Sequence, residues 1–177
     1  MKVCVTGAAG FIGSTLVDRL LAAGHEAVGI ANFSTGFHEF LTRAHGHLRY
    51  RLLEAALTRG DSFADAFAGV DAVFHLSANA DVRFGTQHTS KDLEQNTIAT
   101  YNVLEAMRAH GVREIAFSST GSVYGEAAVI PTPEDAPFPI QTSLYGASKV
   151  AGEGLIAAYC EGFGMRSVIF RFVSILG

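Results

Sequence analysis

The stretch that decides the fold is Lys2–Gly13, which reads KVCVTGAAGFIG. A short apolar run precedes the first glycine, and an amphipathic run at helical spacing follows the second. Gly7, Gly10 and Gly13 recur at every third position between strand and helix. In such a turn the first glycine permits the sharp bend, the second lets backbone approach a pyrophosphate, and the third lets the helix pack on the sheet. The stretch therefore predicts a dinucleotide-binding unit, with the anion on the helix N-terminus.

The rest of the chain alternates short apolar runs, typical of buried parallel strands, with longer amphipathic runs, typical of helices. This alternation implies right-handed crossovers and an α/β fold, a doubly wound parallel sheet of Rossmann type. The 177 residues suit one domain, residues 1–177. The expected strands are Lys2–Thr6, Glu26–Ile30, Leu48–Leu53, Ala72–Ser77, Glu114–Ser119 and Ser167–Val173; the expected helices are Phe11–Ala23, Asp92–His110 and Tyr145–Gly162; and Pro131–Pro139, with all four prolines, is expected to be a loop.

The amino-acid composition excludes several classes of protein. Apolar residues make up 49% and charged residues 17%, so a sizeable core can be buried. The net charge of -4, without a dense Lys/Arg cluster, argues against a nucleic-acid or anionic-membrane surface. No apolar run reaches about 18 residues, so no membrane span is expected. The N-terminus lacks a signal-peptide layout, and two isolated thiols, Cys4 and Cys160, favour a reduced, cytoplasmic setting over a disulfide scaffold or a metal site.

The end of the second expected strand departs from the usual dinucleotide pattern. An acid there normally binds the adenosine ribose hydroxyls. Ala31 stands in its place, and the neighbouring Asn32 offers a neutral amide, which is a weaker partner than a carboxylate. No arginine follows to receive a 2′-phosphate, so the sequence does not clearly favour NADP either.

A second group of residues points to chemistry. Tyr145 and Lys149 are four residues apart, one turn on a shared helix face, and a nearby cation is expected to lower the pKa of the tyrosine. The alternative is a surface pair without chemistry, because this spacing is common by chance; its place after a dinucleotide turn favours a catalytic role. Upstream, four residues with hydroxyl groups lie at the end of an expected strand, at the sheet edge where ligands bind in parallel sheets. They are Ser118, Ser119, Thr120 and Ser122. Ser118 and Ser122 suit turn capping, while Thr120 is expected to face the substrate.

Together these motifs resemble the NAD-dependent epimerase/dehydratase family of extended short-chain dehydrogenases/reductases, and most of all its UDP-glucose 4-epimerase type. The likeness covers essentially the whole chain. It implies removal of a hydride from C4 of a nucleotide-sugar, a UDP-hexose, to NAD, and its return to the other face of a 4-keto intermediate. The matching segments are Val5–Gly13, His75–Ala80, Ser118–Gly125 and Tyr145–Lys149.

The resemblance also implies roles for single residues. Tyr145 is the acid/base on the sugar hydroxyl, Thr120 hydrogen-bonds the same hydroxyl, and Lys149 holds the nicotinamide ribose and tunes Tyr145. No metal is implied. The implied cofactor contacts are Gly7, Gly10, Phe11, Ile12, Gly13, Asn32, Leu57, Leu76, Ser77, Ala78, Asn96, Tyr145, Lys149 and Phe172.

One local feature separates two branches of the family. The 4,6-dehydratases usually carry Asp-Glu directly after the catalytic threonine. Here Gly121 and Ser122 stand at those positions, and neither can act as a carboxylate acid or base. This favours an epimerase over a dehydratase.

The chain also departs from the family pattern. Besides Ala31, the acid that meets the adenine amine after the third strand aligns with Ala56, although Glu54 could shift in, and Ser174 stands where the family often has Asn. Each lost charge-assisted hydrogen bond is expected to weaken cofactor binding about ten-fold or more. Family members are roughly twice as long, so the C-terminal lobe that holds the nucleotide-sugar is expected to be absent.

Three hypotheses follow from these features. The chain is a nucleotide-sugar 4-epimerase or its cofactor half, a truncated or degenerate dinucleotide-binding module without turnover, or another nucleotide-sugar enzyme of the extended family, such as a decarboxylase, reductase or dehydratase. The resemblance further implies a homodimer that pairs the helices at 92–110 and 145–162. The sequence does not specify which nucleotide-sugar is used.

Overall fold

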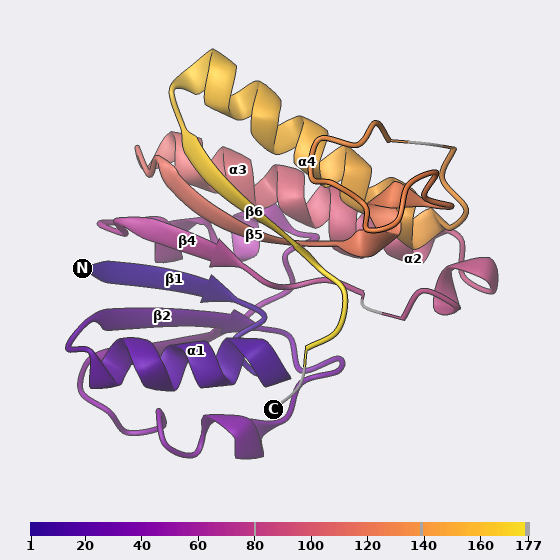
Figure 1. Cartoon of the computed structure of the whole chain (residues 1–177). Helices are drawn as coiled ribbons and strands as arrows, with labels where there is room; N and C mark the ends of the chain where they lie inside the picture. Colours follow the sequence, from indigo (N-terminus) through magenta and orange to yellow (C-terminus); the bar gives the residue numbers. More distant parts are fainter. Residues whose placement is uncertain (80, 139, 176–177) are drawn as a thin grey trace.

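The computed structural model describes residues 1–79, 81–138 and 140–175; Ala80 and Pro139 lie outside the described residues. Six parallel strands form one sheet in the order β3-β2-β1-β4-β5-β6 (Figure 1). The predicted doubly wound α/β sheet is confirmed, and its order reverses between β1 and β4, where ligands bind in such folds. The strands are β1 Lys2–Thr6, β2 Glu26–Ala31, β3 Tyr50–Glu54, β4 Ala72–His75, β5 Glu114–Thr120 and β6 Arg166–Phe172.

The predicted strand ends are correct to within one or two residues. The largest differences are at the start of β3 and the end of β4. β4 ends early because the N–H groups of Leu76 and Ser77 both donate to Oγ1 of Thr6, at 3.1 and 3.2 Å, instead of continuing a ladder. These two residues therefore turn across the end of β1, toward the glycine turn.

Two of the three expected helices form as predicted, and the third is interrupted. The expected helix at 92–110 is divided into α2, a π-helical segment η5 and α3, a correction that periodicity alone could not provide. π-Helical turns are rare and occur often at functional sites. The helices are α1 Phe11–Ala22, α2 Ser90–Asp92, η5 Leu93–Ile98, α3 Ala99–Ala109 and α4 Leu144–Phe163, with short 3₁₀ segments η1 His38–Leu41, η2 Gly60–Ser62, η3 Ala64–Phe67, η4 Phe84–Thr86 and η6 Gly121–Tyr124.

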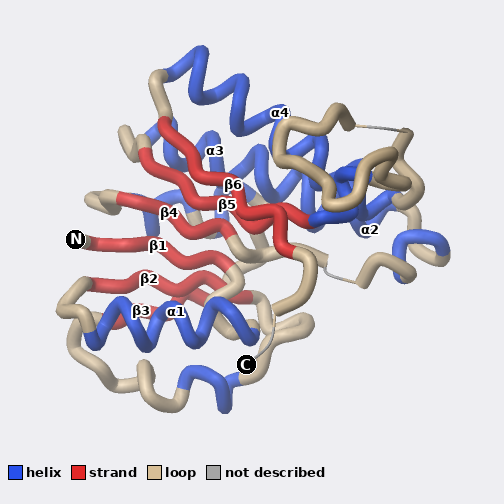
Figure 2. Tube along the Cα trace, in the orientation of Figure 1, coloured by secondary structure: helices blue, strands red, loops and turns tan. Residues whose placement is uncertain are grey.

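Helices cover the sheet unequally (Figure 2). α1 and η1 lie on one side over β1 to β3, and α3 and α4 lie on the other side. The larger hydrophobic core, which includes Phe67, Met107, Phe117 and Ile156, fills the α3–α4 side. On the opposite side, in the described part of the chain, β6 carries no helix, and Val168 and Phe170 are 56% and 41% exposed.

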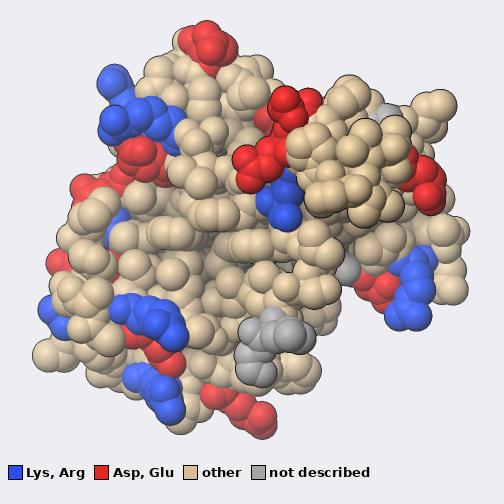
Figure 3. Space-filling model, in the orientation of Figure 1, with Lys and Arg blue, Asp and Glu red and all other residues tan. Residues whose placement is uncertain are grey.

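The surface and the long loop complete the fold. Among the described positions, residues 125–143 form no helix or strand, as expected for the proline-rich segment. Figure 3 shows charged side chains in small groups of both signs on the face it presents. Within the described residues, no helix is both long and apolar enough to span a membrane, and Cys4 and Cys160 are free thiols.

Candidate dinucleotide and catalytic site

The glycine turn joins β1 to α1 with little space for side chains. Gly7 has φ +69°, and a Cβ there would lie 2.9 Å from the backbone nitrogen of Ser77. A Cβ on Gly13 would lie 2.2 Å from the carbonyl oxygen of Gly7. α1 begins after Gly10 with no side-chain cap, so the N–H groups of its first turn have no side-chain acceptor. The turn thus offers an anion the uncapped end of a helix.

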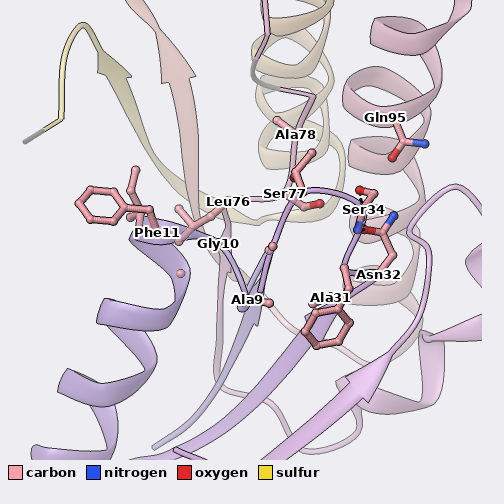
Figure 4. Close-up of a pocket in the computed structure, with 16 residues that line it drawn as sticks. Ala9, Gly10, Phe11, Ala31, Asn32, Ser34, Leu76, Ser77, Ala78 and Gln95 are labelled. Atoms are coloured by element: carbon pink, nitrogen blue, oxygen red, sulfur yellow. Dashed lines mark hydrogen bonds between the residues drawn. The ribbon is translucent and has the colours of Figure 1, made fainter. Parts of the chain in front are cut away.

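A cavity of about 310 Å³ opens at the carboxyl ends of β1, β2 and β4 (Figure 4). Most of the predicted cofactor contacts line it, which fits the pyrophosphate half of a dinucleotide. These residues are Gly7, Gly10, Phe11, Ile12, Gly13, Asn32, Leu76, Ser77 and Ala78.

Sequence reasoning missed part of the lining. The loop after β2 contributes Phe33 and Ser34–Gly36 to the lining. The sequence signal that could have identified this loop is a pair of hydroxyl residues followed by a glycine, directly after a strand. Ala9 could have been predicted as a lining residue, because it lies within the glycine turn. Gln95 comes from the π-helical segment, where ordinary helical spacing does not give the direction of a side chain.

Five of the predicted cofactor residues lie outside this lining: Tyr145 and Lys149, which belong to the catalytic cluster described below, and three others. Leu57 is buried in the hydrophobic core, and its carbonyl oxygen accepts a hydrogen bond from Asn102. Phe172 ends β6 beside Thr120 in the ladder and stacks on Phe170. Asn96 is buried behind the cavity, where it organises other residues. None of these five residues lines the cavity in this structure.

The adenosine end of the cavity has an unusual composition. Ala31 ends β2 and faces the cavity, and Oδ1 of Asn32 accepts hydrogen bonds from the backbone N–H and the hydroxyl of Ser34, at 3.1 and 2.8 Å. Glu54 ends β3 with an exposed side chain, and neither it nor Ala56 lines the cavity. The described lining contains no Asp, Glu, Lys or Arg.

The three predicted catalytic residues come together at the ends of β5 and α4. Oγ of Ser143 caps α4 by accepting from the N–H of Gly146 at 2.9 Å, and the helix then places Tyr145 and Lys149 one turn apart. The phenol of Tyr145 is hydrogen-bonded to the side chain of Thr120. Nζ of Lys149 donates to the carbonyl oxygen of Ser118 at 2.7 Å.

The electrostatics of this cluster differ from the expectation. Burial raises the pKa of Tyr145, the hydrogen bond with Thr120 opposes this, and the charge of Asp92 adds to the increase. The predicted lowering of that pKa by Lys149 is wrong for this structure, because the ammonium is turned toward Ser118 and lies 6.0 Å from the centre of the Tyr145 ring. Burial also lowers the pKa of Lys149 to about 8, against the opposing effect of Glu153.

Asn96 links the loop after β4 to the catalytic helix. Its Oδ1 accepts from the backbone N–H of Asn79 at 2.7 Å, and its Nδ2 donates to Oγ of Ser148 at 2.9 Å. Ser148 in turn donates to the carbonyl oxygen of Tyr145 at 2.7 Å. Because Ala78 lines the cavity and Asn79 follows it, this network joins the cavity to the catalytic cluster.

The buried side chain of His75 on β4 links Thr6 of β1 to Thr100 of α3, and through Thr100 to the π-helical segment. Oγ1 of Thr6 accepts two backbone N–H groups, so its proton is directed to Nδ1 of His75 at 2.7 Å. This arrangement assigns the ring proton to Nε2, which donates to Oγ1 of Thr100 at 3.0 Å, and Thr100 donates to the carbonyl oxygen of Asn96. His75 is fully buried, and burial lowers its pKa to about 3, with the charge of Lys149 adding to the effect.

His75 is expected to make the fold acid-sensitive. Because its folded pKa lies below the unfolded value of about 6.5, the stability is fully present above pH 6.5 and is lost as the pH falls toward 3. This difference amounts to about 2 kcal/mol at pH 5. Urea denaturation from pH 7.5 to 5 checks it, with His75→Gln as a comparison that should show a flatter profile. Equal pH slopes in both proteins would contradict the assignment.

Comparison with known proteins gives the context of this site. A UDP-glucose 4-epimerase from Mycolicibacterium smegmatis is 40% identical over 161 residues, covering 90% of this chain and 51% of that relative. The crystal structure of a UDP-galactose 4-epimerase superposes with a TM-score of 0.87 at 43% identity, covering 97% of this chain and 55% of that one. A dTDP-glucose 4,6-dehydratase from Streptomyces venezuelae superposes with a TM-score of 0.90 at 29% identity, covering 97% of this chain and 55% of its own.

The chain spans about half the length of the curated relatives it matches. The model of the NAD dependent epimerase/dehydratase family matches residues 3–177, nearly the whole chain. The matched range includes the glycine turn, the loop after β4, the hydroxyl residues at the end of β5 and the helix that carries Tyr145 and Lys149. The chain therefore belongs to the NAD dependent epimerase/dehydratase family.

Proposed function

We propose that this chain is the cofactor-binding half of a nucleotide-sugar 4-epimerase of the UDP-glucose/UDP-galactose type, with NAD in the 310 Å³ cavity. The observation that carries the proposal is the meeting of Thr120, Tyr145 and Lys149 at the carboxyl edge of the sheet, joined to the cavity through Asn96. The relatives named above include epimerases that act on such sugars by their descriptions.

Different residues of this chain bind the cofactor and act on the sugar in the proposed reaction. The uncapped start of α1 binds the pyrophosphate, and Leu76–Ala78 line the path toward the catalytic cluster. Bound NAD would supply the hydride acceptor and donor for the sugar. Tyr145 exchanges the proton of the reacting sugar hydroxyl, which Thr120 holds by a second hydrogen bond. Lys149 supplies the positive charge beside the ribose, and its pKa near 8 keeps it mostly protonated at neutral pH.

One alternative function is disfavoured by the residues of the site, and a second has specific support. A dehydratase shares the fold, but the residues after Thr120 are Gly121 and Ser122 in η6, and neither is a carboxylic acid. A binding module without turnover is supported by the uncharged adenosine end and by the half-length match to relatives. The homodimer and the cytoplasmic location stay predictions; α3 and α4, which the dimer would use, lie side by side on one face.

The test is conversion of UDP-glucose to UDP-galactose by the chain and by its Tyr145→Phe variant. We expect turnover to fall about 10³-fold in the variant, because general acid–base catalysis contributes about 10²–10⁴. Tyr101→Phe is the matched control, since Tyr101 is 44% exposed on α3 and should leave turnover unchanged. Full activity of Tyr145→Phe would refute the catalytic assignment, and NAD binding without any turnover would favour the binding module.

A further inference from the structure

The adenosine end of the cavity carries no charge that would recognise position 2′ of the ribose. Its wall is made by Ala31–Gly36 at the end of β2, and by Gln95 from η5. Ala31 is 7% exposed and packs against Ala9 and Leu41, so a methyl group occupies the place where a carboxylate would normally stand. The ribose therefore meets a wall of neutral groups.

No other acid replaces the missing carboxylate. Glu54 lies opposite Ala31 in the β2–β3 ladder, yet its side chain is exposed and outside the lining. The oxygen of Asn32 is already engaged by Ser34. A ribose hydroxyl in this cavity thus finds no ionised acceptor among the described residues.

The loop after β2 is held in place against the glycine turn. The N–H of Phe37 donates to the carbonyl oxygen of Ala9 at 3.0 Å, and a Cβ on Gly36 would lie 2.6 Å from the same oxygen. This close contact keeps Ser34 and Thr35 at the cavity. It also keeps Glu39, the nearest acid after the loop, out of the lining.

Neutral donors remain available at this end. In the described structure, Oγ1 of Thr35 and the side-chain amide of Gln95 make no hydrogen bond, although both residues line the cavity. Figure 4 shows Gln95 on its own helical segment, above Ser34 and Asn32 in this view. A hydroxyl or an amide N–H can donate to a ribose hydroxyl oxygen and also to a phosphate oxygen, so these neutral groups exclude neither cofactor.

We infer that this cavity binds NAD and its 2′-phosphorylated counterpart NADP with similar affinity, and that residue 31 sets this lack of discrimination. A carboxylate at this position accepts from the 2′-hydroxyl and repels a 2′-phosphate, whereas an arginine attracts the phosphate. The cavity holds neither group, so neither cofactor gains a charged contact or suffers a charged repulsion there. The inference rests on the proposed binding of a dinucleotide in this cavity, and not on the epimerase chemistry.

The experiment measures dissociation constants for NAD and NADP by calorimetric titration at one fixed ionic strength, since charge effects depend on salt. For the unmodified chain we expect the two constants to agree within about ten-fold. In Ala31→Asp the ratio of the NADP constant to the NAD constant should rise about ten-fold or more. Ala128→Asp adds the same charge on an exposed loop outside the cavity, and should leave the ratio unchanged.

Because Ala31 is buried, a second variant tests the same charge effect at a position outside the hydrophobic core. Gln95→Glu keeps the shape of its side chain and brings a carboxylate into the lining from η5, so it should also weaken NADP relative to NAD. A preference of the unmodified chain for NAD of about 100-fold or more would overturn the inference, and so would an unchanged ratio in both carboxylate variants. Binding of neither dinucleotide would overturn it together with the proposed function, whereas similar binding of both with full turnover by Tyr145→Phe would refute the catalytic assignment alone.

Discussion

Replacing Gly13 with alanine is expected to destabilise the protein by about 3 kcal/mol and to abolish dinucleotide binding. The added Cβ would lie 2.2 Å from the carbonyl oxygen of Gly7 and 2.9 Å from its carbonyl carbon. Both are backbone atoms of the turn, so α1 must move away from the sheet to relieve the clash. The same shift displaces the helix N-terminus from the pyrophosphate.

Urea denaturation and NAD titration measure the two effects of Gly13→Ala. Gly154→Ala is the matched control, because Gly154 is also helical and a Cβ there meets nothing within 4 Å. That change should stabilise the protein by up to about 1 kcal/mol, as expected for glycine in a helix interior. If Gly13→Ala retained normal stability and NAD binding, the close approach of α1 to the turn would not be essential.

Replacing Arg171 with methionine is expected to cost about 3 kcal/mol, because it leaves the buried carboxylate of Glu153 without its cation. The side chain of Glu153 is 6% exposed, and it accepts from Nη2 and Nε of Arg171 at 2.9 and 3.2 Å and from the hydroxyl of Ser119. Arg171 also donates to the hydroxyl of Tyr124 and the carbonyl oxygen of Glu134. Its loss therefore also frees the proline-rich loop from β6.

Denaturation of three variants separates these contributions. Arg171→Met combined with Glu153→Gln should recover part of the loss, because no buried charge is then left unpaired. Arg166→Met is the matched control on the same strand, since Arg166 pairs with Glu114 but is 81% exposed, and it should cost less than about 1 kcal/mol. Equal losses from the two single changes would show that burial of Glu153 does not determine the effect.

The position of the site could largely be predicted from local sequence. Glycine spacing acts through steric limits within a dozen residues, and Lys149 follows Tyr145 by one helical turn, so both motifs retain their geometry in the structure. The lining residues Ser34–Gly36 and Gln95 could not be predicted in the same way. Their place depends on the contact of the loop with Ala9 and on the π-helical segment, which are set by packing between distant parts of the chain.

The sequence by itself determined the α/β class, the six strands, the glycine turn and the identity of the three catalytic candidates, because periodicity and backbone sterics act locally. Only the tertiary structure decided which residues share the cavity and what charges they meet. Burial of Tyr145 outweighs the attraction expected from Lys149, because the ammonium turns to a carbonyl on β5. Desolvation and the direction of a side chain depend on all the neighbours of a residue, and these neighbours come together only when the sheet and its helices pack.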